Sequence, residues 1–149
     1  MHKLILLVDD DLASLALARQ VLERSGHLVI TATTGLDARR ALDAAKFDVV
    51  VTDIFMPDMD GLELIRHICN TGRSSPIIAM SGGSGAPNFL PVAEALGADL
   101  VLQKPVSPSA LLRAVDDVSV DPAKGLRRAS AAMSPVSEAS VTARVVALR

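Results

Sequence analysis

The sequence predicts an α/β protein built on a parallel β-sheet with helices on both faces. Five short apolar runs alternate with segments whose apolar residues recur at helical spacing, which is the pattern of repeated strand-helix units. The run from Val49 to Thr52 is rich in β-branched residues and lacks polar alternation, as expected for a strand buried on both faces. Aspartate follows two of these runs directly, so polar chemistry is expected where the strands end.

The five strands are expected at the apolar runs, and residue types at the helix ends support the helices between them. Gly26 suits the end of the first helix, and Asp11 and Asp60 suit the starts of the first and third helices. Ser107 followed by Pro108 suits the start of the last helix, because serine is a good N-cap and proline is tolerated in a first turn. The expected strands are residues 4–8, 27–32, 49–52, 76–80 and 99–103, with a short helix around residues 92–96.

This alternation corresponds to a doubly wound, flavodoxin-like (βα)5 fold with strand order 2-1-3-4-5. Right-handed crossovers bring the carboxyl ends of all the strands to one edge of the sheet. Between Pro57, which lacks a backbone N–H, and Gly61, which tolerates unusual dihedral angles, the chain is expected to form a loop. The edge is expected to collect the polar side chains of Asp9, Asp10, Asp53, Ser81 and Lys104.

Three carboxylates at one edge repel one another and remain ionised together only when a cation compensates their charge. Magnesium fits best, because it takes carboxylate, carbonyl and water oxygens and leaves room for a phosphate oxygen. A carboxylate can also attack phosphorus and form an acyl phosphate. A metal ion, an ammonium and a hydroxyl at the same edge would stabilise the charge on the phosphoryl oxygens.

Four motifs occur in order along the chain: "LLVDDD", "VVVTDIFMPDMDG", "IIAMSG" and "GADLVLQKP". With these motifs the sequence resembles the receiver domain of the two-component response regulators over about residues 3–118. The resemblance implies that Asp53 accepts a phosphoryl group from a phosphohistidine on a sensor histidine kinase or a histidine phosphotransfer protein.

The resemblance also implies roles for the residues around Asp53. Asp10 would bind magnesium directly and Asp9 through water, together with Asp53 and the backbone carbonyl of Phe55. Ser81 would bond a phosphoryl oxygen. Lys104 would pair with the phosphoryl group or, before phosphorylation, with Asp53. The peptide bond before Pro105 would be cis, as is typical of the family.

Two positions depart from the family pattern. Many receivers carry an aromatic residue three positions before the lysine that turns inward on phosphorylation, but this chain has Val101, and valine has no ring to relocate. The position after Pro105, often phenylalanine, is Val106. We expect the segment from Gly82 to Pro91 to be a glycine-rich loop. We also expect switching to run through this loop, because glycine raises its conformational entropy before it orders.

The chain is expected to form one receiver domain, residues 1–118, followed by a tail, residues 119–149. The first segment carries ten Lys and Arg against fifteen Asp and Glu, and this acidic balance does not indicate nucleic-acid binding. In the tail, twelve of the 31 residues are Ala or Ser, so we expect a linker or a partly helical segment.

No apolar run reaches the roughly 18 residues of a membrane span, and the first strand comes too early for a signal peptide, so we expect a cytoplasmic protein without a membrane partner. Cys69 falls on an apolar helical position and is expected in the core. The three histidines have no metal-ligand spacing and are expected to be structural or solvent-facing: His2, His27 and His67.

The leading hypothesis for function is a stand-alone receiver, a phospho-accepting switch rather than an enzyme. It would either relay the phosphate or bind an unidentified protein target when phosphorylated. One alternative is a pseudo-receiver that binds partners without phosphorylation. A second is a phosphatase of the haloacid dehalogenase type, with Asp9 as the nucleophile, although Ala13 stands where its signature needs threonine or valine.

Overall fold

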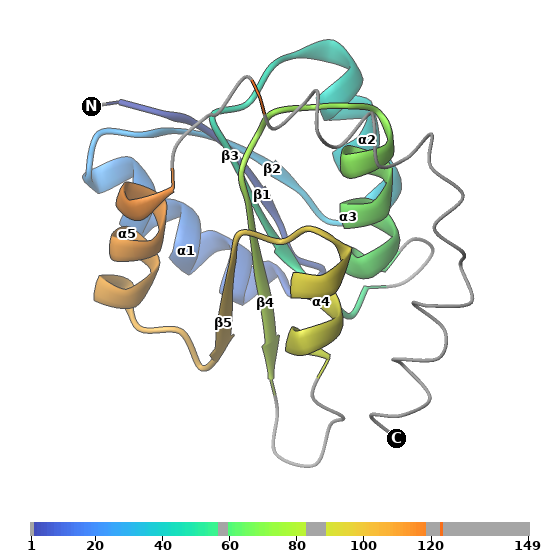
Figure 1. The fold of residues 1–149 in the computed structure, drawn as a ribbon. Coiled ribbons are helices and arrows are strands. Elements are labelled where there is room, and N and C mark those ends of the chain that lie inside the picture. Colours follow the sequence, from blue (N-terminus) through green and yellow to red (C-terminus); the bar gives the residue numbers. More distant parts are fainter. Residues whose placement is uncertain (1, 57–59, 83–88, 119–122, 124–149) are drawn as a thin grey trace.

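The computed structural model describes residues 2–56, 60–82, 89–118 and 123. Five strands alternate with five helices in this part of the chain (Figure 1). The strands are β1 (Leu4–Val8), β2 (Leu28–Ala32), β3 (Val49–Asp53), β4 (Ile77–Gly82) and β5 (Leu100–Lys104). The helices are α1 (Leu12–Arg24), α2 (Gly35–Ala44), α3 (Gly61–Asn70), α4 (Leu90–Leu96) and α5 (Pro108–Asp117).

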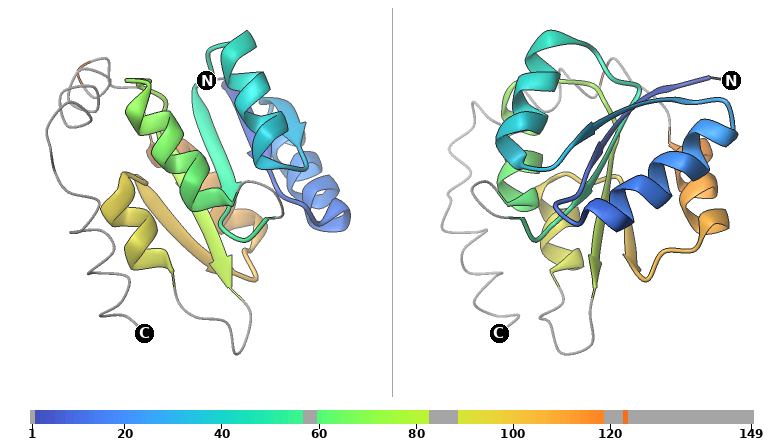
Figure 2. Two further views of the ribbon diagram at one scale, coloured as in Figure 1. Left: turned by 90° about the vertical axis from the view of Figure 1, so that its right-hand side faces the viewer. Right: turned by 180° about the vertical axis from the view of Figure 1, so that it is seen from behind.

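The strands form a single parallel sheet in the order β2-β1-β3-β4-β5, which confirms the predicted fold. Figure 1 shows α1 and α5 on one side of the sheet and α2, α3 and α4 on the other, and the views in Figure 2 agree. β3 lies at the centre, and every one of its residues is buried. An aspartate at the end of this strand is therefore held in the middle of the sheet edge.

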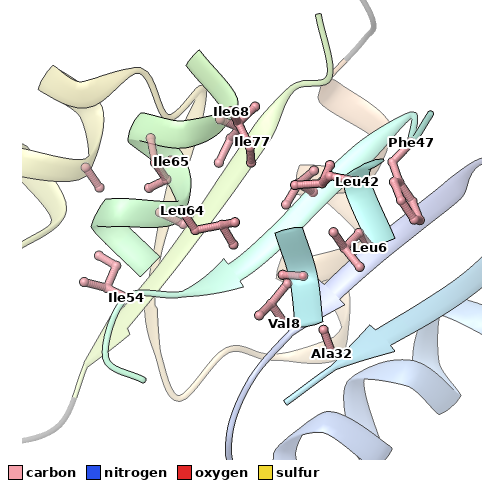
Figure 3. Packing of buried hydrophobic residues seen from close by; sticks show 14 residues of the cluster. Leu6, Val8, Ala32, Leu42, Phe47, Ile54, Leu64, Ile65, Ile68 and Ile77 are labelled. Atoms are coloured by element: carbon pink, nitrogen blue, oxygen red, sulfur yellow. The ribbon is translucent and has the colours of Figure 1, made fainter. Parts of the chain in front are cut away.

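Each face of the sheet packs its own apolar cluster. The cluster under α2, α3 and α4 runs along β3 from Phe47 to Ile54 and includes Leu42 and Leu64 (Figure 3). The cluster under α1 and α5 includes Leu15, Leu22, Leu111 and Val115. Cys69 is partly buried against the first cluster, which agrees with its predicted place in the core.

Side-chain caps define where most helices begin. Asp11 accepts a hydrogen bond from the Ala13 N–H, and Asp60 accepts one from the Glu63 N–H. Ser107 caps α5 in the same way, and Thr34, which the sequence analysis did not single out, caps α2. These bonds satisfy backbone donors that have no partner within the helix, so each loop enters its helix at a defined residue.

β1 has the predicted bounds, and the other four strands differ from the predicted ones by one or two residues at an end. The largest difference is in β4, which continues through Ser81 to Gly82 because Gly82 pairs with Lys104 of β5. Gly82 therefore belongs to a strand rather than to the expected loop. Residues 83–88, the centre of the proposed switch segment, lie outside the described residues, as do Pro57 and nearly all of the tail.

At the other end of the sheet, Lys3 joins the first strand to the last helix. Its ammonium donates hydrogen bonds to the carbonyls of Val115 and Val118 at the end of α5, and its backbone N–H donates to Nδ1 of His27 at 3.2 Å. His27 is buried, and this burial lowers the pKa of its imidazole below the ordinary value of 6.5. The histidine is thus structural, as predicted.

Because folding lowers the pKa of His27, we expect acid to destabilise the protein through this residue. Between its lowered pKa and 6.5, the unfolded chain binds more protons at this position, so its contribution to stability is complete above 6.5 and is lost as the pH falls. In addition, a protonated Nδ1 can no longer accept the Lys3 N–H. Urea unfolding at pH 7.5 and 5.5 should show a smaller acid-induced loss in His27→Asn than in wild type, and equal losses would contradict this role.

Candidate functional site

The polar side chains named from the sequence come from four strands and meet at the carboxyl edge of the sheet. Asp9 and Asp10 directly follow β1, and Asp53 is the last residue of β3. Ser81 and Lys104 lie on the neighbouring strands β4 and β5. Parallel pairing places these strand ends side by side, as the sequence predicted.

One ammonium group links the two buried carboxylates at this edge. Nζ of Lys104 lies 2.9 Å from Oδ2 of Asp53 and 3.0 Å from Oδ2 of Asp9. The two carboxylate side chains are only 11% and 3% exposed, respectively, so water screens these ion pairs weakly. The resemblance had implied only the pair with Asp53, and the bond to Asp9 is an additional finding.

Burial and ion pairing have opposite effects on the pKa values of Asp53 and Lys104. Burial raises the pKa of Asp53, which the hydrogen bond from Lys104 counteracts without cancelling. Burial also favours the neutral form of Lys104, but its hydrogen bonds to Asp53 and Asp9 outweigh this and raise its pKa. The lysine is therefore charged at neutral pH, and one positive charge faces two carboxylates.

A third carboxylate, that of Asp10, is exposed beside this pair. One carboxylate oxygen from each of Asp9, Asp10 and Asp53 lies within 4.8 Å of the others. Asp9 is also oriented by the Asp11 N–H, which donates to its Oδ1 at 3.0 Å. An all-oxygen group of this size and negative charge matches the ligand preference of a magnesium ion.

The backbone around Asp53 is packed closely enough to hold its side chain in one place. The Phe55 N–H donates to Oδ1 of Asp53 at 3.2 Å, while Oδ2 accepts from Lys104. Gly61, the first residue of α3, donates its N–H to the carbonyl of Ile54. A Cβ at Gly61 would lie 2.0 Å from the Asp53 carbonyl oxygen, so only glycine fits here. This requirement explains the glycine that ends the "MPDMDG" motif.

Ser81 and Gly82 are the last two residues of β4. This strand lies between β3, which ends with Asp53, and β5, which ends with Lys104. Asp53 pairs with Met80, so Ser81 lies one residue beyond it, and Ser81 is buried. A Cβ at Gly82 would lie 2.7 Å from both the backbone N and O of Lys104. The missing side chain thus lets the lysine backbone approach β4, a function that the sequence analysis, which placed Gly82 in a loop, did not predict.

The remaining candidates differ in how the structure places them. Val101 is partly buried against the cluster under α2, α3 and α4. The Lys104–Pro105 peptide bond is cis, as expected.

Phe55 is 44% exposed, and its ring contacts that of Phe89 edge to face, with centroids 5.2 Å apart. The sequence analysis did not identify Phe89, because no local residue pattern indicates that it contacts Phe55, which is far from it in the sequence.

Comparisons with known proteins find similar sequences over most of this chain. Residues 5–116 match the family described as "Response regulator receiver domain". The chain is 35% identical over 113 residues to the transcriptional regulatory protein GlrR of Escherichia coli, and 35% identical over 108 residues to the alkaline phosphatase synthesis transcriptional regulatory protein PhoP of Bacillus subtilis. These matches span 76% and 72% of this chain but only 25% and 45% of the two relatives.

A solved structure shows the same fold. The chemotaxis response regulator CheY4 of Vibrio cholerae superposes with a TM-score of 0.71 at 28% sequence identity. The match covers 78% of this chain and 98% of that one.

None of the helices in the described part of this chain is long and apolar enough to cross a membrane.

Proposed function

This chain belongs to the response regulator receiver domain family, and from that premise we propose that Asp53 accepts a phosphoryl group and so switches the protein between two states. The donor would be a phosphohistidine on a sensor kinase or a phosphotransfer protein. The observation that supports this most strongly is the single ammonium of Lys104 bonded to both Asp53 and Asp9. It places a positive charge where the phosphoryl oxygens would develop negative charge.

In the proposed reaction, a carboxylate oxygen of Asp53 attacks the phosphorus atom. The bond between phosphorus and the donor's imidazole nitrogen breaks, and its electron pair remains on that nitrogen. Lys104 would exchange its bond to Asp53 for one to a phosphoryl oxygen, and the hydroxyl of Ser81 would donate to another. The buried setting of Asp53 strengthens these interactions.

The carboxylates of Asp9, Asp10 and Asp53, with the backbone carbonyl of Phe55, would hold magnesium at this edge. When bound, the ion would neutralise negative charge shared by the carboxylates and the phosphoryl group. Among the described residues, Lys104 supplies one positive charge to this group of three carboxylates. A divalent cation would neutralise the negative charge that remains.

The proposal concerns the receiver itself, residues 1–118, with residues 119–149 as a linker-like or partly helical tail. The curated relatives extend well beyond the matched part, so the output can lie with a separate target, with a phosphate relay or with sequence joined to the receiver. In each case phosphorylation acts by stabilising one of two conformations more than the other.

Intact mass spectrometry after incubation with acetyl phosphate and magnesium tests the proposal. Wild type should gain one phosphoryl group, and Asp53→Asn should gain none. The matched variant Asp60→Asn changes an exposed aspartate that caps α3 and should still gain the group. Incorporation into Asp53→Asn would place the nucleophile elsewhere, with Asp9 the first residue to test.

Phe55 lies two residues after the acceptor, and its apolar side chain is expected to hinder the water that hydrolyses the acyl phosphate. Phe55→Asn replaces the ring with a small polar group that can hydrogen-bond this water, so its phosphoryl group should be lost several-fold faster. The decay of the phosphorylated mass after removal of acetyl phosphate measures this rate. A slower decay in the variant than in wild type would contradict the expectation.

A further inference from the structure

The contact between Phe55 and Phe89 connects the proposed phosphorylation site to α4. The backbone of Phe55 is fixed beside the acceptor, because its N–H donates to Oδ1 of Asp53. The residue as a whole, by contrast, is 44% exposed, so solvent would allow its ring several rotamers. The edge-to-face contact with Phe89, at an interplanar angle of 75°, favours one of them.

Phe89 is held in place firmly enough to orient the ring of Phe55. It is the N-cap residue of α4, and its carbonyl accepts the Ala93 N–H at 3.0 Å. Its ring is partly buried against the cluster that also contains Ile54 and Leu64. Phe89 is therefore packed against the core, whereas Phe55 is exposed and, among the described residues, has the ring of Phe89 as its aromatic contact.

We propose that Phe89 is a positioning residue that holds the Phe55 ring beside Asp53 and thereby slows hydrolysis of the phosphorylated protein; the inference rests on the proposed function. In that hydrolysis, the oxygen of water bonds to phosphorus and the bond from phosphorus to the Asp53 carboxylate oxygen breaks. The electron pair stays on the carboxylate, and a water proton passes to solvent. The attacking water must reach the phosphorus atom from the solvent side of the Asp53 carboxylate. A Phe55 ring held beside Asp53 restricts this approach.

An aromatic edge-to-face contact is worth enough to change a rate by about two- to tenfold when it must be broken for water to enter. We therefore expect Phe89→Leu to shorten the lifetime of the phosphorylated protein by that factor. Phe89→Tyr keeps the ring and should retain the wild-type lifetime. Because Phe89 acts through Phe55, Phe89→Leu should have no further effect when Phe55 is already leucine.

The experiment follows the intact mass of protein phosphorylated with acetyl phosphate and magnesium, after the small molecules are removed. It compares wild type, Phe55→Leu, Phe89→Leu, Phe89→Tyr and the double leucine variant. Phe47→Leu is the matched control: Phe47 is the remaining one of the three phenylalanines in the chain, belongs to the same core cluster and lies at the opposite end of β3 from Ile54 (Figure 3). It can change stability but should leave the lifetime unchanged.

The expected result is faster decay in Phe55→Leu and Phe89→Leu, with the double variant decaying like Phe55→Leu. A wild-type lifetime in Phe89→Leu overturns the inference. Independent, multiplying effects of the two leucine substitutions, or an equally fast decay in Phe47→Leu, also overturn it. A wild-type protein that gains no phosphoryl group overturns the proposed function and this inference together, whereas equal lifetimes in phosphorylated proteins overturn the inference alone.

Discussion

Replacing Lys104 with methionine should slow phosphoryl transfer to Asp53 by about 100- to 1000-fold, the usual loss when one preorganised donor to a developing charge is removed. The ammonium bonds both Asp53 and Asp9 in this structure, and among the described residues Lys104 is the ion-pair partner of both carboxylates. Methionine keeps most of the length and apolar stem of lysine but removes the charge. The rate of mass gain with acetyl phosphate and magnesium measures the effect.

Lys46→Met makes the same substitution at an exposed lysine outside the site and should leave this rate unchanged. Circular dichroism of both variants would show that the fold is intact. If Lys104→Met is phosphorylated as fast as Lys46→Met, the ammonium does not stabilise the transferring group and the proposed role of Lys104 is wrong.

Gly61→Ala should lower the free energy of unfolding by about 3 kcal/mol, at the upper end of what overpacking usually costs. The added Cβ would lie 2.0 Å from the carbonyl oxygen of Asp53 and 2.6 Å from Cα of Ile54, and backbone atoms cannot rotate away as a side chain can. Either the start of α3 or the end of β3 must move. Because β3 ends with the acceptor, phosphorylation should also become slower.

Urea unfolding followed by circular dichroism measures the stability of this variant. Glu63→Ala, an exposed change two residues further along α3, provides the comparison and should cost at most about 1 kcal/mol. Equal unfolding midpoints for Gly61→Ala and wild type would show that the close approach of α3 to β3 is not required.

Much of the fold could be predicted because its elements have local signals. The β-branched run before Asp53 marks the central strand, and Asp11, Asp60 and Ser107 are N-cap residues in both prediction and structure. Once the strands are parallel, topology alone brings their carboxyl ends together. The polar residues at those ends could therefore be grouped before any contact was known.

Contacts between distant loops and strand ends could not be predicted in this way. The bond between Lys104 and Asp9 joins residues at opposite ends of the domain, and the contact between Phe55 and Phe89 joins two different loops. Gly82 was assigned to a loop because glycine usually breaks a strand, yet here its missing side chain admits the backbone of Lys104. Each of these features depends on tertiary packing, which local residue patterns do not encode.

The most direct test of the central proposal is to locate the phosphoryl group chemically. Borohydride reduces the acyl carbon of an aspartyl phosphate and releases phosphate, which converts the phosphorylated aspartate into homoserine. Trypsin then separates residues 47–66, which contain Asp53, from residues 4–19, which contain Asp9 and Asp10. Fragmentation of these peptides should place homoserine at position 53, only after incubation with acetyl phosphate. Homoserine at position 9 or 10 would contradict the account.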